Sequence, residues 1–272
     1  MEMIDLSRLE PQETLNHTSK GNQLKWKCYG YWYKADHMGY EGLAETIVSA
    51  LLGKSTVKYP FVAYEYSQIK YKDRVYSGCK SADFLADGYD LIPLEKLYRK
   101  FTGGSLAVDT AHQGEITDQI NFLVNFVEQT TGLQEFGRYL TSMLEIDAFF
   151  LNEDRHTNNI AVQYNAADNT YALCPLFDNG LSLLADTNMD FPLERSLEDC
   201  LKTVEAKPFS RYFDEQLDAA EELYGIQLHF NFSTNDVKAL IDSYRTAYSQ
   251  EICDRCEALI RRQMRHYGYL VK

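Results

Sequence analysis

A polar segment at residues 152–160 interrupts the apolar pattern of the chain and holds most of the side chains that could do chemistry. Its acidic residues have no packing rationale, because the segment follows an amphipathic stretch and precedes two short strand-like runs. A second acid, Asp178, comes after those runs in the turn-like sequence Asp178-Asn179-Gly180. Two carboxylates and an amide therefore flank one predicted hairpin.

Phosphoryl transfer needs such a set of side chains. One carboxylate must orient the attacking hydroxyl and accept its proton, and oxygen ligands must hold Mg²⁺ against the phosphates. Asp154 is the predicted base, Asn159 a predicted metal ligand, and Asp178 the predicted ligand of the Mg²⁺ that bridges the outer phosphates. Each part alone has a plainer explanation, since Asp, Asn and Gly are common in caps and turns. Their joint occurrence around one hairpin favours a functional site.

Two motifs resemble a known family. Residues 154–160 are similar to the Asp-Arg-His-x-x-Asn-Ile signature of phosphoinositide-kinase-like enzymes, with the Asp-to-Asn offset of five found in protein-kinase catalytic loops. Within that group the chain resembles HipA-like serine/threonine kinases, which share Asn-x-Asp-x-His-x-x-Asn (residues 152–159) and Pro-x-Phe/Tyr-Asp (residues 175–178). The resemblance implies an ATP- and Mg²⁺-dependent kinase that phosphorylates Ser or Thr of a protein or of itself.

The two basic residues of the polar segment have several interpretations. We favour His156 as a hydrogen-bonding residue that braces the catalytic loop, ahead of direct proton transfer, because Asp154 already fits the base. Metal ligation by His156 is the least favoured role, since Mg²⁺ prefers oxygen. Arg155 has three open interpretations, which are pairing with Asp178, contact with a phosphate, or a plain surface position.

The resemblance also implies a strand lysine on the nucleotide phosphates, held by an acid from a helix. Lys34, at the end of an aromatic strand-like run, is the preferred lysine, with Lys25 and Lys27 as competing candidates. Glu45 is its preferred partner and Glu41 the alternative.

The polar connection at residues 18–23 is the predicted phosphate-covering loop. Backbone amides together with Ser19, Lys20 and Gly21 would contact phosphate there. Phosphorylation of Thr18 or Ser19 would eject the loop by charge repulsion, which makes either residue a candidate autophosphorylation site.

The elements that must position these residues divide the chain into a β-rich N-lobe (1–90) and a mainly helical C-lobe (91–272), an α+β arrangement of the two-lobed protein-kinase-like type. Aromatic runs, alternation and helical spacing predict the N-lobe order strand, strand, helix, strand, strand at 24–27, 31–34, 40–53, 61–69 and 74–80. The C-lobe is predicted to have a hairpin (160–164 and 170–174) and helices at 115–130, 135–150, 209–224, 234–248 and 249–266. Ligand sites commonly lie between two such lobes.

The composition limits the classes of binding partner that we expect. A formal net charge of −13 argues against direct binding of nucleic acid, because the average surface repels phosphate backbones. The sequence offers no 18-residue apolar run and no apolar signal core, and its six scattered cysteines suit reduced thiols, so we expect a cytoplasmic protein without a membrane partner. A protein substrate is the expected partner, and an inhibitory partner protein is compatible with the resemblance. The oligomeric state is not specified by the sequence.

Other functions stay open at this stage. The Asp-Arg-His order suits a lipid or small-molecule kinase as well, and a nucleotide-binding pseudokinase would also use this fold. A paired-carboxylate hydrolase would explain Asp154 and Asp178 but not Asn159. We expect the compact version of the HipA-like fold, because the chain has no room for the additional N-terminal subdomain of the longer toxins. The toxin–antitoxin role, the DNA-bound partner and the translation-factor substrate of those toxins therefore do not carry over with the motifs.

Overall fold

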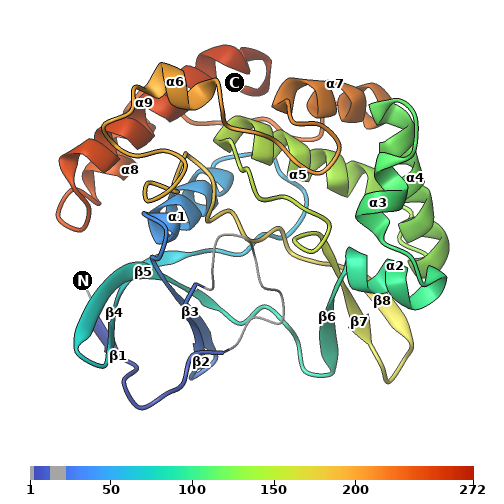
Figure 1. Ribbon diagram of the computed structural model, residues 1–272, viewed down its shortest axis with the longest axis horizontal. Helices are drawn as coiled ribbons and strands as arrows, with labels where there is room; N and C mark the ends of the chain where they lie inside the picture. Colours follow the sequence, from blue (N-terminus) through green and yellow to red (C-terminus); the bar gives the residue numbers. More distant parts are fainter. Residues whose placement is uncertain (1–2, 13–22) are drawn as a thin grey trace.

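A computed structural model describes residues 3–12 and 23–272 and shows a curled sheet on one side of the molecule and most helices on the other (Figure 1). The sheet has the strand order β1-β4-β5-β3-β2, antiparallel except for the parallel pair β1 and β4. Its strands are β1 (Met3–Asp5), β2 (Lys25–Cys28), β3 (Tyr31–Ala35), β4 (Glu65–Tyr71) and β5 (Arg74–Ala82). The predicted order of strands 2 to 5 and the intervening helix is confirmed, and β1 is an addition.

Local sequence explains the β2–β3 hairpin. The loop is Tyr29-Gly30, and both residues have positive φ, 49° and 78°. Two consecutive residues with positive φ are the backbone of a type I′ turn, whose twist matches that of the flanking strands. The turn pairs Lys25 with Lys34 across the two strands.

Helix α1 (Glu41–Leu52) crosses the sheet and packs on β3, β4 and β5. Leu43, Ile47 and Leu51 recur at helical spacing and are fully buried. Gly42 permits the close approach, because a Cβ at this position would lie 2.6 Å from Cα of Gly78 in β5. The contact holds the first turns of α1 tightly against the strands.

A second sheet lies beside the helices, with the antiparallel order β6-β7-β8. The predicted hairpin forms β7 (Ala161–Asn165) and β8 (Thr170–Leu173), and β6 (Tyr89–Pro93) pairs with β7. Residue 90, the predicted end of the N-lobe, lies within β6. The strand that connects the two lobes therefore belongs by pairing to the helical half.

The remaining helices begin with α2 (Leu94–Thr102), α3 (Leu106–Ala111), α4 (Ile116–Thr131) and α5 (Phe136–Phe150). They continue with α6 (Leu197–Leu201), α7 (Phe213–Tyr224), α8 (Thr234–Asp242), α9 (Gln250–His266) and the 3₁₀ turn η1 (Gly268–Leu270). Two predicted helices are too long. The first starts at residue 213 rather than 209, because Ser210 Oγ accepts a bond from the Tyr212 N–H in a tight turn. The second ends at Asp242, where the Ser243 hydroxyl donates to the carbonyl of Leu240.

The main hydrophobic core lies between α1 and the helices of the second half, with α5 at its centre. A smaller core on the other face of the five-stranded sheet contains Leu6, Trp26, Tyr33, Ala35, Ile69 and Tyr71. Trp26 and Tyr33 point away from the helical half, so their strand neighbours Lys25 and Lys34 point toward it. The sheet thus presents lysines to the C-lobe.

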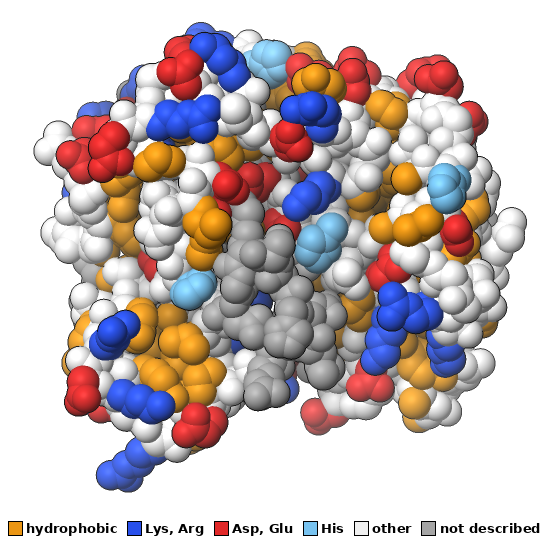
Figure 2. All heavy atoms as spheres, in the orientation of Figure 1, with side chains coloured by type: hydrophobic (Ala, Val, Ile, Leu, Met, Phe, Trp, Pro, Cys, Tyr) orange, Lys and Arg blue, Asp and Glu red, His pale blue; other side chains and the backbone are white. Residues whose placement is uncertain are grey.

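The surface carries both charge signs. On the face drawn in Figure 2, Lys and Arg side chains lie among Asp and Glu side chains rather than in a separate field. Among the helices that the structure describes, none combines the length and the apolar character needed to cross a bilayer.

Candidate active site

The loop after α5 carries the first group of predicted site residues. Helix α5 ends at Phe150, and the next residue, Leu151, has a φ of 56° and turns the chain sharply into the polar segment. The Asn152 side chain then donates to Asp147 Oδ1 (2.8 Å) and accepts from the backbone N–H of Asp154 (3.2 Å). The end of α5 and the buried side chain of Asn152 therefore fix the start of the loop that carries Asp154.

The Asp154 carboxylate is held from both sides and is partly exposed, with 21% of its side chain accessible. Asn159 Nδ2 donates to Oδ2 (3.2 Å) and to the backbone carbonyl of Asp154 (2.8 Å). Lys207 Nζ and His156 Nε2 lie 3.4 Å and 3.7 Å from Oδ1. The predicted catalytic trio of Asp154, His156 and Asn159 is thus one contact cluster, and the sequence did not point to Lys207.

Arg155 is not on the surface, since only 2% of the residue is exposed. Its Nε and Nη2 donate to both carboxylate oxygens of Asp147 (2.8 and 3.0 Å). Its Nη1 donates to the carbonyls of Asn159 (3.1 Å) and Phe177 (3.0 Å), and Nη2 donates to Asn179 Oδ1 (3.1 Å). The surface interpretation was wrong, and the ion-pair partner is Asp147 rather than Asp178. Burial of the guanidinium selects this partner, because Asp147 is itself fully buried and offers two oxygens to the fork.

The same guanidinium joins the two predicted functional loops. Its Nη1 group bonds the backbone at Asn159, in the first loop, and at Phe177, immediately before Asp178 in the second. Asn159 turns its amide nitrogen toward Asp154, which leaves its oxygen facing elsewhere. The structure therefore holds an amide oxygen and a carboxylate on two loops that one side chain clamps together.

Across the cleft, Lys34 of β3 meets acids from both halves of the molecule. Lys34 Nζ lies 2.6 Å from Glu45 Oε1 in α1 and 2.9 Å from Asp178 Oδ1. Glu45 Oε2 accepts the backbone N–H of Asn179 (2.9 Å). Glu41, the alternative partner, instead accepts backbone N–H bonds at the start of α1, from residues 37, 38 and 39. The geometry brings together Lys34, Glu45 and Asp178, whose roles toward a nucleotide stay predictions.

Electrostatic interactions keep Lys34 and Asp178 charged. Burial alone would lower the pKa of Lys34, but Asp178 and Glu45 raise it well above its ordinary value. Burial alone would raise the pKa of Asp178, but the ammonium groups of Lys34 and Lys25 hold it well below its usual range. Asp178 therefore stays a carboxylate, the form in which it can bind a metal.

A cavity of 140 Å³ opens beside these residues, between the five-stranded sheet and the loop after β8. Its walls carry the charged side chains of Lys25, Lys34 and Asp178. They also carry Phe84 and Phe177, whose ring centroids lie 5.6 Å apart. Aromatic rings together with cations suit a ligand that has a flat apolar part and an anionic part.

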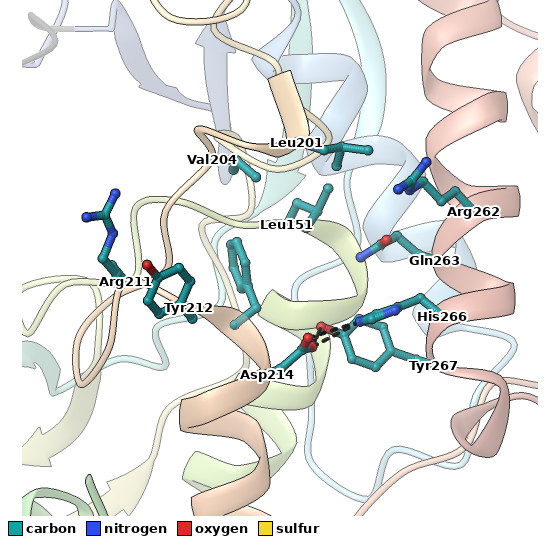
Figure 3. Close-up of a pocket in the computed structure, with 11 residues that line it drawn as sticks. Leu151, Leu201, Val204, Arg211, Tyr212, Asp214, Arg262, Gln263, His266 and Tyr267 are labelled. Atoms are coloured by element: carbon teal, nitrogen blue, oxygen red, sulfur yellow. Dashed lines mark hydrogen bonds and ion pairs between the residues drawn. The ribbon is translucent and has the colours of Figure 1, made fainter. Parts of the chain in front are cut away.

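Two further cavities lie outside this cleft. A polar one of 300 Å³ has Glu153, Asp190, Arg195 and Lys207 on its walls and opens next to Asp154 through Lys207. Another, of 230 Å³, lies among α7, α9 and the loop after α6, with Arg211 and Arg262 on opposite sides (Figure 3).

The ionisable groups of the Figure 3 cavity are already satisfied. His266 Nε2 lies 3.1 Å from Asp214 Oδ1, and the Tyr267 hydroxyl donates to the same oxygen (2.6 Å). Arg211 and Arg262 pair with Glu205 and Glu198. None of the predicted site residues that the structure describes lines this cavity, so we place the candidate site in the cleft.

Sequence reasoning found part of the site. Ser19, Lys20 and Gly21, with Thr18, lie outside the described residues, so the predicted phosphate loop is untested. Asp147 was missed, although an acid within the otherwise apolar end of α5 is a signal of a buried polar partner. Lys207 was missed because nothing in its local sequence relates it to a loop some 50 residues earlier.

The curled five-stranded sheet, the helix that presents an acid to a strand lysine, and the loops on either side of a C-lobe hairpin define a two-lobed protein-kinase-like fold of the α+β class. No protein-family model and no curated protein sequence matches the chain. Among solved structures, the chain is similar to the Helicobacter pylori proinflammatory kinase CtkA, with a TM-score of 0.65 and 15% sequence identity over 97% of this chain and 95% of that one. The likeness extends over both lobes and establishes the shared fold.

Proposed function

We propose that the chain is an ATP- and Mg²⁺-dependent kinase of the HipA-like type, which transfers the γ-phosphate to a Ser or Thr hydroxyl of a protein or of itself. The observation that carries the proposal is the meeting of three elements at one cleft. These are the Lys34–Glu45 pair, the carboxylate of Asp178, and the loop with Asp154 and Asn159 clamped beside it by Arg155. The likeness to a kinase structure supports the same reading.

The reaction follows from where these groups lie. The acceptor hydroxyl attacks the γ-phosphorus, the bond from that phosphorus to the β–γ bridging oxygen breaks, and ADP leaves. Asp154, oriented by Asn159 and Lys207, accepts the hydroxyl proton. Lys34, fixed by Glu45, holds the phosphates of the nucleotide in place, so that little reorganisation is needed during transfer.

The residues present fit a magnesium ion. Asp178 and Asn159 offer a carboxylate and an amide oxygen, the hard donors that Mg²⁺ prefers, and Asp178 stays ionised. These two residues would hold the metal, which when bound neutralises negative charge on the phosphates. In the structure Asp178 pairs with Lys34, so its carboxylate has a cationic partner before any metal arrives.

The polar cavity beside Asp154 supports a protein acceptor over a lipid. Its walls carry charges of both signs, including Glu153, Asp190 and Arg195. A polypeptide segment can offer polar and charged groups to such a surface, whereas an acyl chain offers it none. We therefore propose a protein substrate that enters from this side.

The test uses the full chain with γ-labelled ATP and Mg²⁺, offered a mixture of acceptor proteins in one arm and phosphoinositide vesicles in the other. We expect label on protein, and Asp154→Asn to lower its rate by at least about 100-fold while keeping the ATP-induced rise in melting temperature. Asp168→Asn, the same change on the exposed hairpin turn, is the matched control and should label normally.

Three results would contradict the proposal in different ways. Normal labelling by Asp154→Asn would exclude Asp154 as the base. Label confined to the vesicles would identify a lipid kinase. A melting shift without label in either arm would identify a nucleotide-binding pseudokinase.

A further inference from the structure

Arg255, in α9, is a buried arginine outside the candidate active site, since only 9% of the residue is exposed. Its Nη1 donates to the backbone carbonyl of Phe191 (2.6 Å). Its Nη2 donates to three more backbone carbonyls, those of Pro192, Leu193 and Arg195 (2.9, 3.1 and 3.2 Å). One guanidinium therefore gathers four carbonyls from a single short stretch of the chain.

The partners of Arg255 differ in kind from those of Arg155, which pairs with a carboxylate. In the described part of the chain no carboxylate forms an ion pair with Arg255, and carbonyl dipoles compensate its charge instead. The segment 190–195 has no helix or strand of its own, so no regular backbone ladder fixes its shape. Its conformation is thus tied to a side chain at least 60 positions later in the sequence.

The same segment forms part of the wall of the polar cavity next to Asp154. Asp190, Phe191 and Arg195 line this cavity. Arg195 Nη1 donates to the carbonyl of Asp190 (3.3 Å), so one wall residue is held against another. Arg255 is not among the residues that line the cavity, and it can act there only through the segment 190–195.

We propose that Arg255 is a positioning residue for the protein acceptor, which holds the segment 190–195 in the shape that the acceptor binds. The inference rests on the proposed function, which places the acceptor in this cavity. It adds a determinant of acceptor binding that contacts neither the nucleotide nor the reacting groups. A lysine would replace Arg255 only in part, because three donors on one nitrogen do not spread over four carbonyls as a planar fork does.

The test separates binding of the acceptor from binding of ATP. Dephosphorylated casein is the probe acceptor for the full chain as wild type, Arg255→Met and Arg255→Lys, and kcat and KM are measured for casein and for ATP. We expect Arg255→Met to raise KM for casein by about 10-fold or more and to change KM for ATP by less than about 2-fold, because the segment lies on the acceptor side of Asp154. Arg255→Lys should have an intermediate KM for casein.

A second measurement follows the segment directly. Amide hydrogen exchange in the segment 190–195 should be at least about 10-fold faster in Arg255→Lys than in the wild type, with exchange in α5 unchanged. Arg261→Met is the matched control on the same helix, because Arg261 has 34% of its side chain exposed and pairs with Glu257 one turn earlier. It should keep the wild-type KM values and the wild-type exchange.

The outcomes separate this inference from the proposed function. A wild-type KM for casein in both Arg255 variants would overturn the inference alone. A lower kcat with both KM values unchanged would overturn it too, since that result reports only a smaller folded fraction. If Arg255→Met does not fold, Arg255→Lys decides by the same measurements, and unchanged exchange in its segment 190–195 would also contradict the inference. A wild type that labels no protein, casein included, would overturn the proposed function and the inference together.

Discussion

Two buried cations organise the cleft, and they differ in how completely their partners use them. The Arg155 cluster comprises Arg155, Asp147, Asn152 and Asn179, all at most 4% exposed. The Lys34 cluster comprises Lys34, Glu45 and Asp178, of which Asp178 has 26% of its side chain exposed. The first cluster lies within the helical half, whereas the second joins β3, α1 and the loop after β8.

The number of satisfied donors explains the difference. Arg155 has five N–H groups, and the structure supplies five contacts to Asp147, Asn179 and two backbone carbonyls. Such a cation has no free N–H donor for a ligand, and its role is to hold the two loops in position. Lys34 binds one acid that is buried and one that faces the cavity, so Asp178 can exchange its contact for another cation without exposing a buried charge. We infer that the saturated cluster positions the loops and that the open cluster works on the ligand.

The largest expected effect comes from breaking the saturated cluster. Arg155→Met leaves the fully buried carboxylate of Asp147 without its cation, so we expect the free energy of unfolding to fall by about 3–5 kcal/mol in urea denaturation. Phosphoryl transfer should be lost as well, because the loops of Asn159 and Asp178 are no longer clamped.

The double variant Arg155→Met with Asp147→Asn tests the cause. Removal of both charges should recover part of the lost stability, since no uncompensated charge then remains buried. A single variant within about 1 kcal/mol of the wild type would show that Arg155 is not structural.

Removal of the cation from the open cluster should affect turnover more strongly than stability. We expect Lys34→Met to lower turnover by at least about 100-fold but to cost only about 2–3 kcal/mol of stability. Asp178 keeps its access to water, and Glu45 keeps the N–H of Asn179. Rates with saturating ATP and urea denaturation on the same preparation measure both quantities. Lys70→Met is the control, and a stability loss equal to that of Arg155→Met would remove the distinction between the clusters.

The sequence revealed the loop of Asp154, and Asp178 of the open cluster, more readily than the saturated cluster. Asp154, His156 and Asn159 are close in the chain, so their spacing alone predicted a shared loop. Asp178 was predicted because it follows the same hairpin. The burial of Arg155 could not be read, because it depends on α5 bringing Asp147 against the loop, and charged residues near a turn are usually exposed.

The fold shows the same division. Periodicity predicted the β2–β3 hairpin, α1 and the hairpin of β7 and β8, because each depends on neighbours in the chain. The pairing of β6 with β7 joins residues about 70 positions apart, and the parallel pairing of β1 with β4 spans a similar distance. Such contacts leave no local pattern, so the strand connecting the lobes was predicted as a boundary.

Another acid, Asp36, lies just beyond Lys34 and is partly buried, and in the described part of the chain it forms no ion pair. Its carboxylate accepts the Tyr248 hydroxyl (2.8 Å), from the segment before α9, and the backbone N–H of Gly42 (2.6 Å) at the start of α1. Burial, reinforced by the negative charge of Glu41, raises its pKa to about 7. Asp36 therefore marks a contact between the lobes that prefers the protonated acid.

The sign of the resulting pH dependence follows from proton binding. Between pH 4 and pH 7 the unfolded chain has lost the proton of Asp36 while the folded protein keeps it, so stability falls as the pH rises through this range. We expect Asp36→Asn to remove the contribution of this acid to the pH dependence of the free energy of unfolding. As the pH rises from 4.5 to 8, the stability of the variant should therefore increase relative to that of the wild type by on the order of 1–2 kcal/mol. Urea denaturation at several pH values measures the difference, with the exposed Asp168→Asn as control. Parallel curves for Asp36→Asn and wild type would show that Asp36 is ionised in the folded protein.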